Sequence, residues 1–157
     1  MIEVEVLGIR LEEGMNSPIL MLQEQSGQMR VLELWIGAVE AGAIAFSLQD
    51  LKSPRPLTHE LILDTLAAAG VEISSVEVTE LRSGTYYAEI SLSNGARVSA
   101  RPSDAVAIAV HAGVNVYVAE AVMDEAGKVV ESEIAEEDQI EEFREFLENL
   151  NPEDFSA

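Results

Sequence analysis

The 157-residue chain contains no cysteine. This absence excludes disulfide bonds, thiol catalysis and thiolate metal sites, and it fits a reducing compartment, so we expect a cytoplasmic protein. No apolar run reaches the roughly 20 residues that a membrane-spanning helix requires. The opening segment lacks the basic and apolar regions of a secretory signal, so we expect neither a leader nor a membrane partner.

Basic residues are also scarce. Nine Lys and Arg residues stand against 29 Asp and Glu residues, which gives a formal net charge of −20. The acidic residues are concentrated at the end, where residues 120–157 carry 14 acids and two bases. Tight binding to bulk nucleic acid depends on Lys and Arg neutralising phosphates, so this composition argues against such binding. It permits an acidic helix that contacts a partner protein.

The apolar pattern predicts an α+β domain. The length is that of one domain with its own core, and both period-two strands and period-3.6 helices are present. We expect a domain over residues 1–127 and an acidic C-terminal segment over 128–157. The expected strands lie at about 2–6, 18–24, 29–36, 76–81, 85–92, 96–100 and 115–118. The expected helices lie at about 38–50, 58–69, 103–113, 119–125 and 136–150.

The two halves of the domain resemble each other. Residues 4–10 and 76–82 share four identities in seven, and residues 40–45 align with residues 104–109. Chance matching of common apolar residues is one explanation. Duplication of a strand-strand-strand-helix unit is the other, and it predicts one mixed sheet with packed helices.

An acidic residue begins the helix in each half, namely Glu40 and Asp104. The simplest explanation is complementation of the helix dipole, worth about 0.3–1 kcal/mol each. The functional alternative is that the fold brings both carboxylates into one cleft. There they would hold Mg²⁺ or Mn²⁺, which prefer oxygen ligands.

The segment Arg55–Glu60 offers a second group of candidates. His59 is one of two histidines, and at an exposed helix start it is either a polar surface residue or a general base or metal ligand. Arg55 precedes the helix and is placed to meet an anion at its N-terminus. Thr58 is the expected N-cap of that helix.

The third group is Arg101–Asp104, in which Ser103 is the expected N-cap. Arg101 is either a phosphate contact or the partner of Asp104 in an ion pair that fixes the turn. Glu60 and Asp64 fit a solvated helix face, and His111 fits a helix C-terminus. We expect Trp35 and Tyr117 in the core.

Several of these motifs together resemble the bifunctional nuclease domain family over about residues 3–127. The matching residues, in order, are Leu34-Trp-Ile-Gly37 with Glu40-Ala, Arg55-Pro-Leu-Thr-His59, Arg101-Pro-Ser-Asp-Ala105, Val116-Tyr-Val118 and Glu120. The ending Phe143–Phe155 is similar to the acidic tail of actinobacterial members. The resemblance implies a duplicated α+β fold, a dimer, and nuclease activity on DNA and RNA. Family members often have an acid two residues before Arg101, where this chain has Ser99.

Two functional hypotheses follow. In the first, Glu40 and Asp104 bind a divalent cation and His59 activates water for phosphodiester hydrolysis of single-stranded nucleic acid. The expected substrate contacts are Arg55, Thr58, Arg101 and Ser103. In the second, the chain is a non-catalytic, acidic homodimeric module with a regulatory role that binds a protein partner or a small anion, and the helix-start acids only stabilise their helices.

Overall fold

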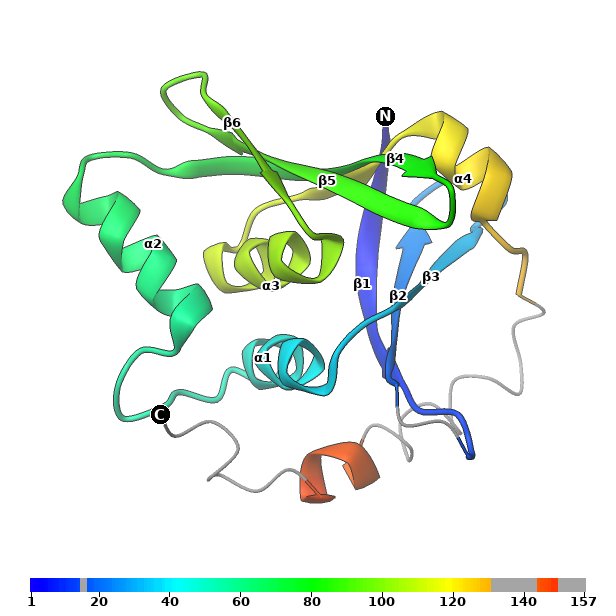
Figure 1. The fold of residues 1–157 in the computed structure, drawn as a ribbon, viewed down its shortest axis with the longest axis horizontal. Coiled ribbons are helices and arrows are strands. Elements are labelled where there is room, and N and C mark those ends of the chain that lie inside the picture. Colours follow the sequence, from blue (N-terminus) through cyan, green and yellow to red (C-terminus); the bar gives the residue numbers. More distant parts are fainter. Residues whose placement is uncertain (15–16, 131–143, 150–157) are drawn as a thin grey trace.

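The computed structural model describes residues 1–14, 17–130 and 144–149, and it confirms the α+β class (Figure 1). Helices and strands occur close to where the sequence pattern places them. The strands are β1 (Ile2–Arg10), β2 (Ile19–Glu24), β3 (Val31–Trp35), β4 (Ile73–Arg82), β5 (Thr85–Leu92), β6 (Arg97–Ala100) and β7 (Val116–Val118). The helices are α1 (Ala38–Leu48), α2 (Thr58–Ala68), α3 (Pro102–Ala112) and α4 (Glu120–Ala126).

The strands form one mixed sheet in the order β3-β2-β1-β7-β4-β5-β6. The short strand β7 joins the halves, because it pairs antiparallel with β1 and parallel with β4. Each half contains three antiparallel strands followed by a helix, and α2 is inserted between the halves. This order agrees with the expected repeat unit, while duplication as its origin stays a prediction.

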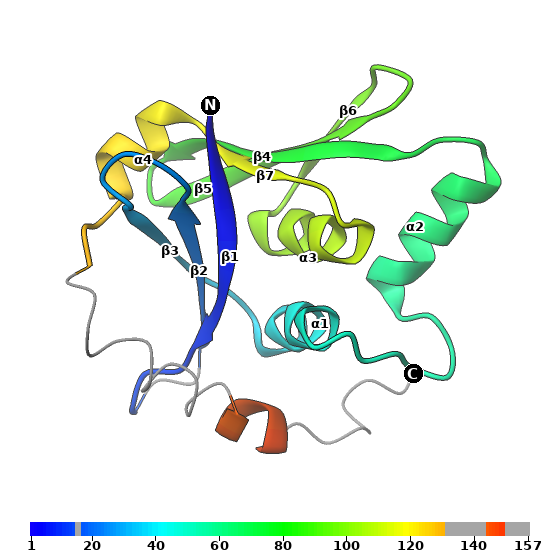
Figure 2. The same cartoon turned by 180° about the vertical axis from the view of Figure 1, so that it is seen from behind.

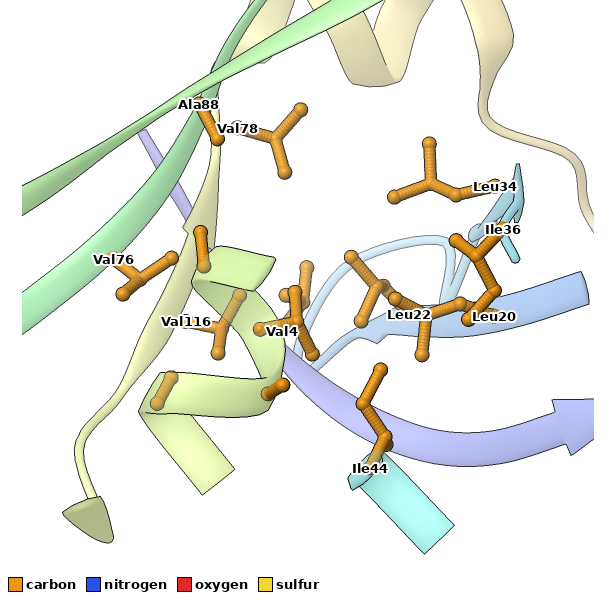
Figure 3. Packing of buried hydrophobic residues seen from close by; sticks show 14 of the residues in the cluster. Val4, Leu20, Leu22, Leu34, Ile36, Ile44, Val76, Val78, Ala88 and Val116 are labelled. Carbon is orange, nitrogen blue, oxygen red and sulfur yellow. The ribbon is translucent and has the colours of Figure 1, made fainter. Parts of the chain in front are cut away.

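The sheet curls around α1 and α3, which pack against each other inside it (Figures 1 and 2). Both helices turn alanines into the core, so their backbones approach closely. Ile44 of α1 points toward Leu20 and Leu22 of β2, while Val76 and Val116 extend the core under the other half (Figure 3). Burying one such side chain stabilises the fold by about 1.5–3 kcal/mol. The core therefore fixes how the starts of α1 and α3 lie relative to each other.

Local turn chemistry explains several boundaries. Gly95 adopts a positive φ of 85° in the β5–β6 turn, as the Asn94-Gly95 pair predicts. Gly113 ends α3 in the left-handed conformation, with a φ of 69°. The expectation for Trp35 is wrong, because this side chain is 52% exposed. It follows Leu34 on β3, and alternation turns it to the face opposite the core.

The acidic C-terminal segment is described only in part. Residues 144–149 are helical, within the expected helix at 136–150, whereas residues 131–143 and 150–157 lie outside the described residues. Phe146 packs into the main core. The backbone of Lys128 pairs with Val31 of β3, and the domain boundary at residue 127 stays a prediction. Within the described ranges, no helix is both long enough and apolar enough to span a bilayer.

Candidate functional site

The starts of α1, α2 and α3 bring four of the candidate side chains together. Each of these helices begins just after an extended residue: Gly37 before α1, Leu57 before α2 and Arg101 before α3. Because α3 packs against both other helices, side chains from all three first turns meet. The site thus combines segments that lie far apart in the sequence.

Asp104 is the centre of this cluster. Its Oδ1 accepts a hydrogen bond from Nε2 of His59 at 3.0 Å. Its Oδ2 accepts one from Nε of Arg101 at 2.9 Å, and Nη2 of Arg101 lies 2.8 Å from the same oxygen. The His59 side chain is only 12% exposed, so the expectation of an exposed surface histidine is wrong. The His59 ring is held by Asp104 within the helix interface.

Arg101 also contacts the second carboxylate. Its Nη2 donates to Oε1 of Glu40 at 3.1 Å, so one nitrogen bridges Glu40 and Asp104. Glu40 is 19% exposed and Arg101 is 67% exposed. The other Glu40 oxygen packs against Gly37, and a Cβ at that position would overlap it. The missing side chain at Gly37 is therefore what lets the carboxylate reach Arg101.

The ion pairs set the charge of Asp104. Burial acts to raise its pKa, but the hydrogen bonds from His59 and Arg101 and the positive charge of Arg101 outweigh burial, so the pKa is lowered. The bonds to Asp104 and then Glu40 raise the pKa of Arg101 in turn. At neutral pH the site contains a permanent guanidinium cation and an ionised Asp104.

Two further residues, Glu60 and His111, belong to the cluster, although the sequence favoured a solvated helix face for Glu60 and a helix C-terminus for His111. The ring of His111 stacks on that of His59, with centroids 6.5 Å apart and planes 10° apart. Nδ1 of His111 lies 3.8 Å from Oε1 of Glu60, and the His111 side chain is 9% exposed. Burial lowers the pKa of His111 and favours its neutral form. The spacing His59–Glu60 followed by His111 carries no local signal, because only packing of α2 on α3 unites them.

The remaining predicted substrate contacts take no part in the hydrogen bonds and ion pairs that hold this centre together among the described residues. Arg55 is exposed on the loop before α2 and forms no ion pair with any residue that the structure describes. Thr58 is exposed in the first turn of α2, where Leu57 and not Thr58 is the N-cap. Ser103 is also not the N-cap, since α3 begins at Pro102 and Ser103 is 7% exposed. Its burial leaves it poorly placed to touch a substrate.

Ser99 is directed away from the cluster. It pairs with Glu89 on β5, and strand alternation puts this pair on the face opposite the one that carries the buried Ile90. An acid at this position would stand on the outer face of the sheet beside Glu89. Having serine in place of an acid at position 99 therefore removes no carboxylate from the Asp104 centre.

The donor set does not fit a divalent cation in this arrangement. The guanidinium of Arg101 lies between Glu40 and Asp104 and satisfies both carboxylates. No group of three or more His, Cys, Asp or Glu side chains suited to a metal occurs in the described ranges. Binding of Mg²⁺ or Mn²⁺ by Glu40 and Asp104 stays a prediction.

The fold and site define an α+β protein with an Asp–His pair and a bridging arginine at converging helix starts. A family model described as the bifunctional nuclease domain matches residues 20–131. Two curated relatives are "Uncharacterized protein MT1877" and "Uncharacterized protein Rv1829" of two Mycobacterium tuberculosis strains, CDC 1551 / Oshkosh and ATCC 25618 / H37Rv. Each is 46% identical over 162 residues, covering 99% of this chain and 98% of the relative.

The chain belongs to the bifunctional nuclease domain family. The resemblance seen in the sequence motifs is thereby confirmed, and the mycobacterial relatives agree with an actinobacterial type of member. The four motif residues Glu40, His59, Arg101 and Asp104 lie within the matched range.

Proposed function

We propose that the protein hydrolyses phosphodiester bonds of single-stranded DNA or RNA, with His59 as general base. The observation that carries this proposal is the 3.0 Å hydrogen bond between Nε2 of His59 and Oδ1 of Asp104. An ionised carboxylate only accepts hydrogen bonds, so Nε2 carries the proton. Nδ1 is then the basic nitrogen that receives a proton from the attacking water.

Asp104 acts through His59. Its lowered pKa keeps it ionised, so it holds the imidazole in one tautomer and stabilises the imidazolium that forms when Nδ1 takes up a proton. The water oxygen then forms a bond to phosphorus, and the bond from phosphorus to the leaving oxygen breaks. The proton held on His59 is available to that leaving oxygen.

Arg101 supplies positive charge to the phosphate. Its hydrogen bonds to the two carboxylates use Nε and Nη2, and its Nη1 donors have no partner within the described part of the chain, on a side chain that is 67% exposed. Guanidinium donors bind phosphate oxygens strongly. Arg55, exposed before α2, is the second expected phosphate contact. Thr58 is exposed in the first turn of α2, and its hydroxyl is the remaining group there that we expect to contact the substrate.

The test is hydrolysis of a labelled single-stranded oligonucleotide by highly purified protein. His59→Ala and Asp104→Asn should each lower the rate by about 100-fold or more, because general base catalysis supplies about 10² to 10⁴. Asp124→Asn, on the exposed side of α4, is the matched control and should retain the wild-type rate. Activity that persists in both site variants would show a contaminant or another centre. A parallel titration with Mg²⁺, Mn²⁺ and EDTA measures the predicted metal dependence.

A second candidate function is a non-catalytic acidic module that binds a protein partner or a small anion. The double pairing of Arg101 favours it, because Glu40 and Asp104 already balance the arginine charge as a structural ion network would. This hypothesis expects no turnover by the wild-type protein. It also expects no salt-sensitive binding of oligonucleotides, whereas the hydrolase hypothesis expects binding that weakens with salt.

A homodimer is part of either proposal. Helix α2 has no buried residue, and it exposes Leu61 and Ile62. A second copy of the chain would cover these side chains. Leu61→Lys together with Ile62→Lys should shift a dimer to monomer in sedimentation velocity, and an unchanged mass would remove α2 as the interface. We also propose that the protein is cytoplasmic, because a sequence without cysteine fits a reducing compartment.

A further inference from the structure

The imidazole ring of His111 is held by contacts to all three helices of the site. It belongs to the last turn of α3, its side chain is only 9% exposed, and it hydrogen-bonds to the backbone of Ala43 on α1. Oε1 of Glu60 on α2 lies 3.8 Å from its Nδ1. Glu60 is itself held in place, because its Oε2 accepts a hydrogen bond from the backbone N–H of Leu57 at 3.3 Å. The ring therefore has a defined orientation in the folded protein.

This ring stacks on the proposed general base. The planes of the His59 and His111 rings are 10° apart, and their centroids are 6.5 Å apart. The separation falls in the range of about 4.5–7 Å in which aromatic rings attract each other. Both side chains are largely shielded from water, since His59 is 12% exposed and His111 is 9% exposed. Turning the His59 ring about its Cβ–Cγ bond would break this parallel contact.

The plane of the His59 ring matters for its bond to Asp104. The N–H group of an imidazole lies in the plane of the ring, so the 3.0 Å bond from Nε2 of His59 to Oδ1 of Asp104 requires a particular ring orientation. Asp104 holds only the edge of the ring that carries Nε2. A flat neighbour holds the plane, and the plane sets the direction in which Nδ1 meets the attacking water.

His111 does not take the proton that His59 receives. No hydrogen bond joins the two imidazoles within the described part of the chain. Burial lowers the pKa of His111, and it outweighs the effects of Glu60 and of the backbone bond, which act to raise the pKa. A positive charge on His59 lowers this pKa as well. The geometry therefore suits His111 to holding the other ring in place and does not suit it to relaying a proton.

We propose that His111 is a positioning residue for His59, whose flat ring holds the His59 imidazole in the plane that its bond to Asp104 requires. The inference rests on the proposed hydrolase function, because it gives His111 a part in aligning the general base of that reaction. It predicts that a flat side chain at position 111 can replace the histidine, whereas a side chain of another shape cannot.

The test compares His111→Phe with His111→Leu by NMR of the imidazole groups, without substrate. Both variants remove the bond to Ala43 and the ionisable ring, so they differ in whether a flat ring remains at position 111. In wild type, the Nε2 proton of His59 should exchange slowly with water, because it is bonded to Asp104. His111→Phe should retain this slow exchange, whereas His111→Leu should speed it about fivefold or more.

Hydrolysis of the labelled oligonucleotide gives a second readout. His111→Leu should lower kcat about tenfold and leave KM unchanged, because a misaligned base slows the reaction without weakening the binding of phosphate. His111→Phe should keep kcat within about threefold of wild type. A purely structural role for His111 would make the two variants lose activity together, in proportion to their loss of folded protein.

The outcomes separate this inference from the hydrolase proposal. Faster exchange in His111→Leu alone supports alignment of His59 by His111 even if no oligonucleotide is cleaved, in which case only the hydrolase proposal fails. Cleavage by both variants at the wild-type kcat overturns the positioning role and leaves the hydrolase intact. Equal exchange rates in the two variants also overturn it. If the backbone amide spectrum shows that either variant is unfolded, His111→Tyr and His111→Met repeat the comparison of a flat with a non-flat side chain.

Discussion

Nε2 of His59 donates a 3.0 Å hydrogen bond to Oδ1 of Asp104, although the two residues are 45 positions apart in the chain. The contact joins the first turn of α2 to the first turn of α3. The same carboxylate holds Arg101, which continues to Glu40 on α1. One aspartate therefore ties three helix starts together, and its ionisation affects both the proposed chemistry and the stability of the site.

Asp104 should make the folded state sensitive to acid. Its pKa in the folded chain is lowered from 3.8, so its contribution to stability is complete above that value. The contribution is lost as the pH falls through the folded-state pKa. The difference in the free energy of unfolding between wild type and Asp104→Asn should therefore shrink between pH 7 and pH 2 in urea titrations. A difference that stays constant over this range would contradict the assigned ion pairs.

His111 should act over a higher range of pH. Burial lowers its pKa in the folded state below 6.5, so the unfolded chain takes up a proton first as the pH falls. The free energy of unfolding should decrease below pH 6.5, by at most about 1.4 kcal/mol per pH unit for this one group. Wild type should lose more stability than His111→Gln between pH 7.5 and pH 5 in chemical denaturation. Parallel curves for the two proteins would show that His111 titrates as in the unfolded chain.

Gly37→Ala should separate Glu40 from Arg101 without unfolding the protein. The added Cβ overlaps only the end of the flexible Glu40 side chain, so this carboxylate swings away. The free energy of unfolding should change by less than about 1 kcal/mol. Structure determination of the variant should find Arg101 still on Asp104 but no longer on Glu40. An unmoved Glu40, or loss of the fold, would contradict this prediction.

The core and the α2 surface should respond differently to truncation. Ile44 is completely buried between α1 and the sheet, and Ile44→Ala should destabilise the protein by about 2–5 kcal/mol. Leu61 is 52% exposed on α2, and Leu61→Ala should change stability by about 0.5 kcal/mol or less in the monomer. Thermal or urea unfolding of the two variants at one protein concentration measures the contrast. Equal losses would show that α2 is part of the core.

Much of the fold was predictable because its signals are local. Alternation in Ile2–Val6, the Asn94-Gly95 turn and the apolar stripe of the helix that contains Ile44 each depend on a few neighbouring residues. The predicted N-caps of α2 and α3 are displaced from the observed ones by one and two residues. Thr58 and Ser103 have the chemistry of N-caps, yet the chain enters α2 from Leu57 and α3 from Arg101.

Exposure was harder to predict than secondary structure. Trp35 was expected in the core, but strand alternation puts it on the outer face. His59 was expected at the surface because it begins a helix, but α3 covers it with Asp104 and His111. Both errors concern which neighbour an element meets, and that information is spread over the whole chain.

The sequence by itself determined the α+β class, the positions of most elements and the family motifs, because turn chemistry and apolar period act over a few residues. It also supplied Glu40, His59, Arg101 and Asp104 as candidates. Only the tertiary structure decided that these four side chains touch, that His111 and Glu60 join them, and that Ser99 faces away. Those relationships follow from how the curled sheet packs α3 against α1 and α2, which depends on contacts between residues far apart in sequence.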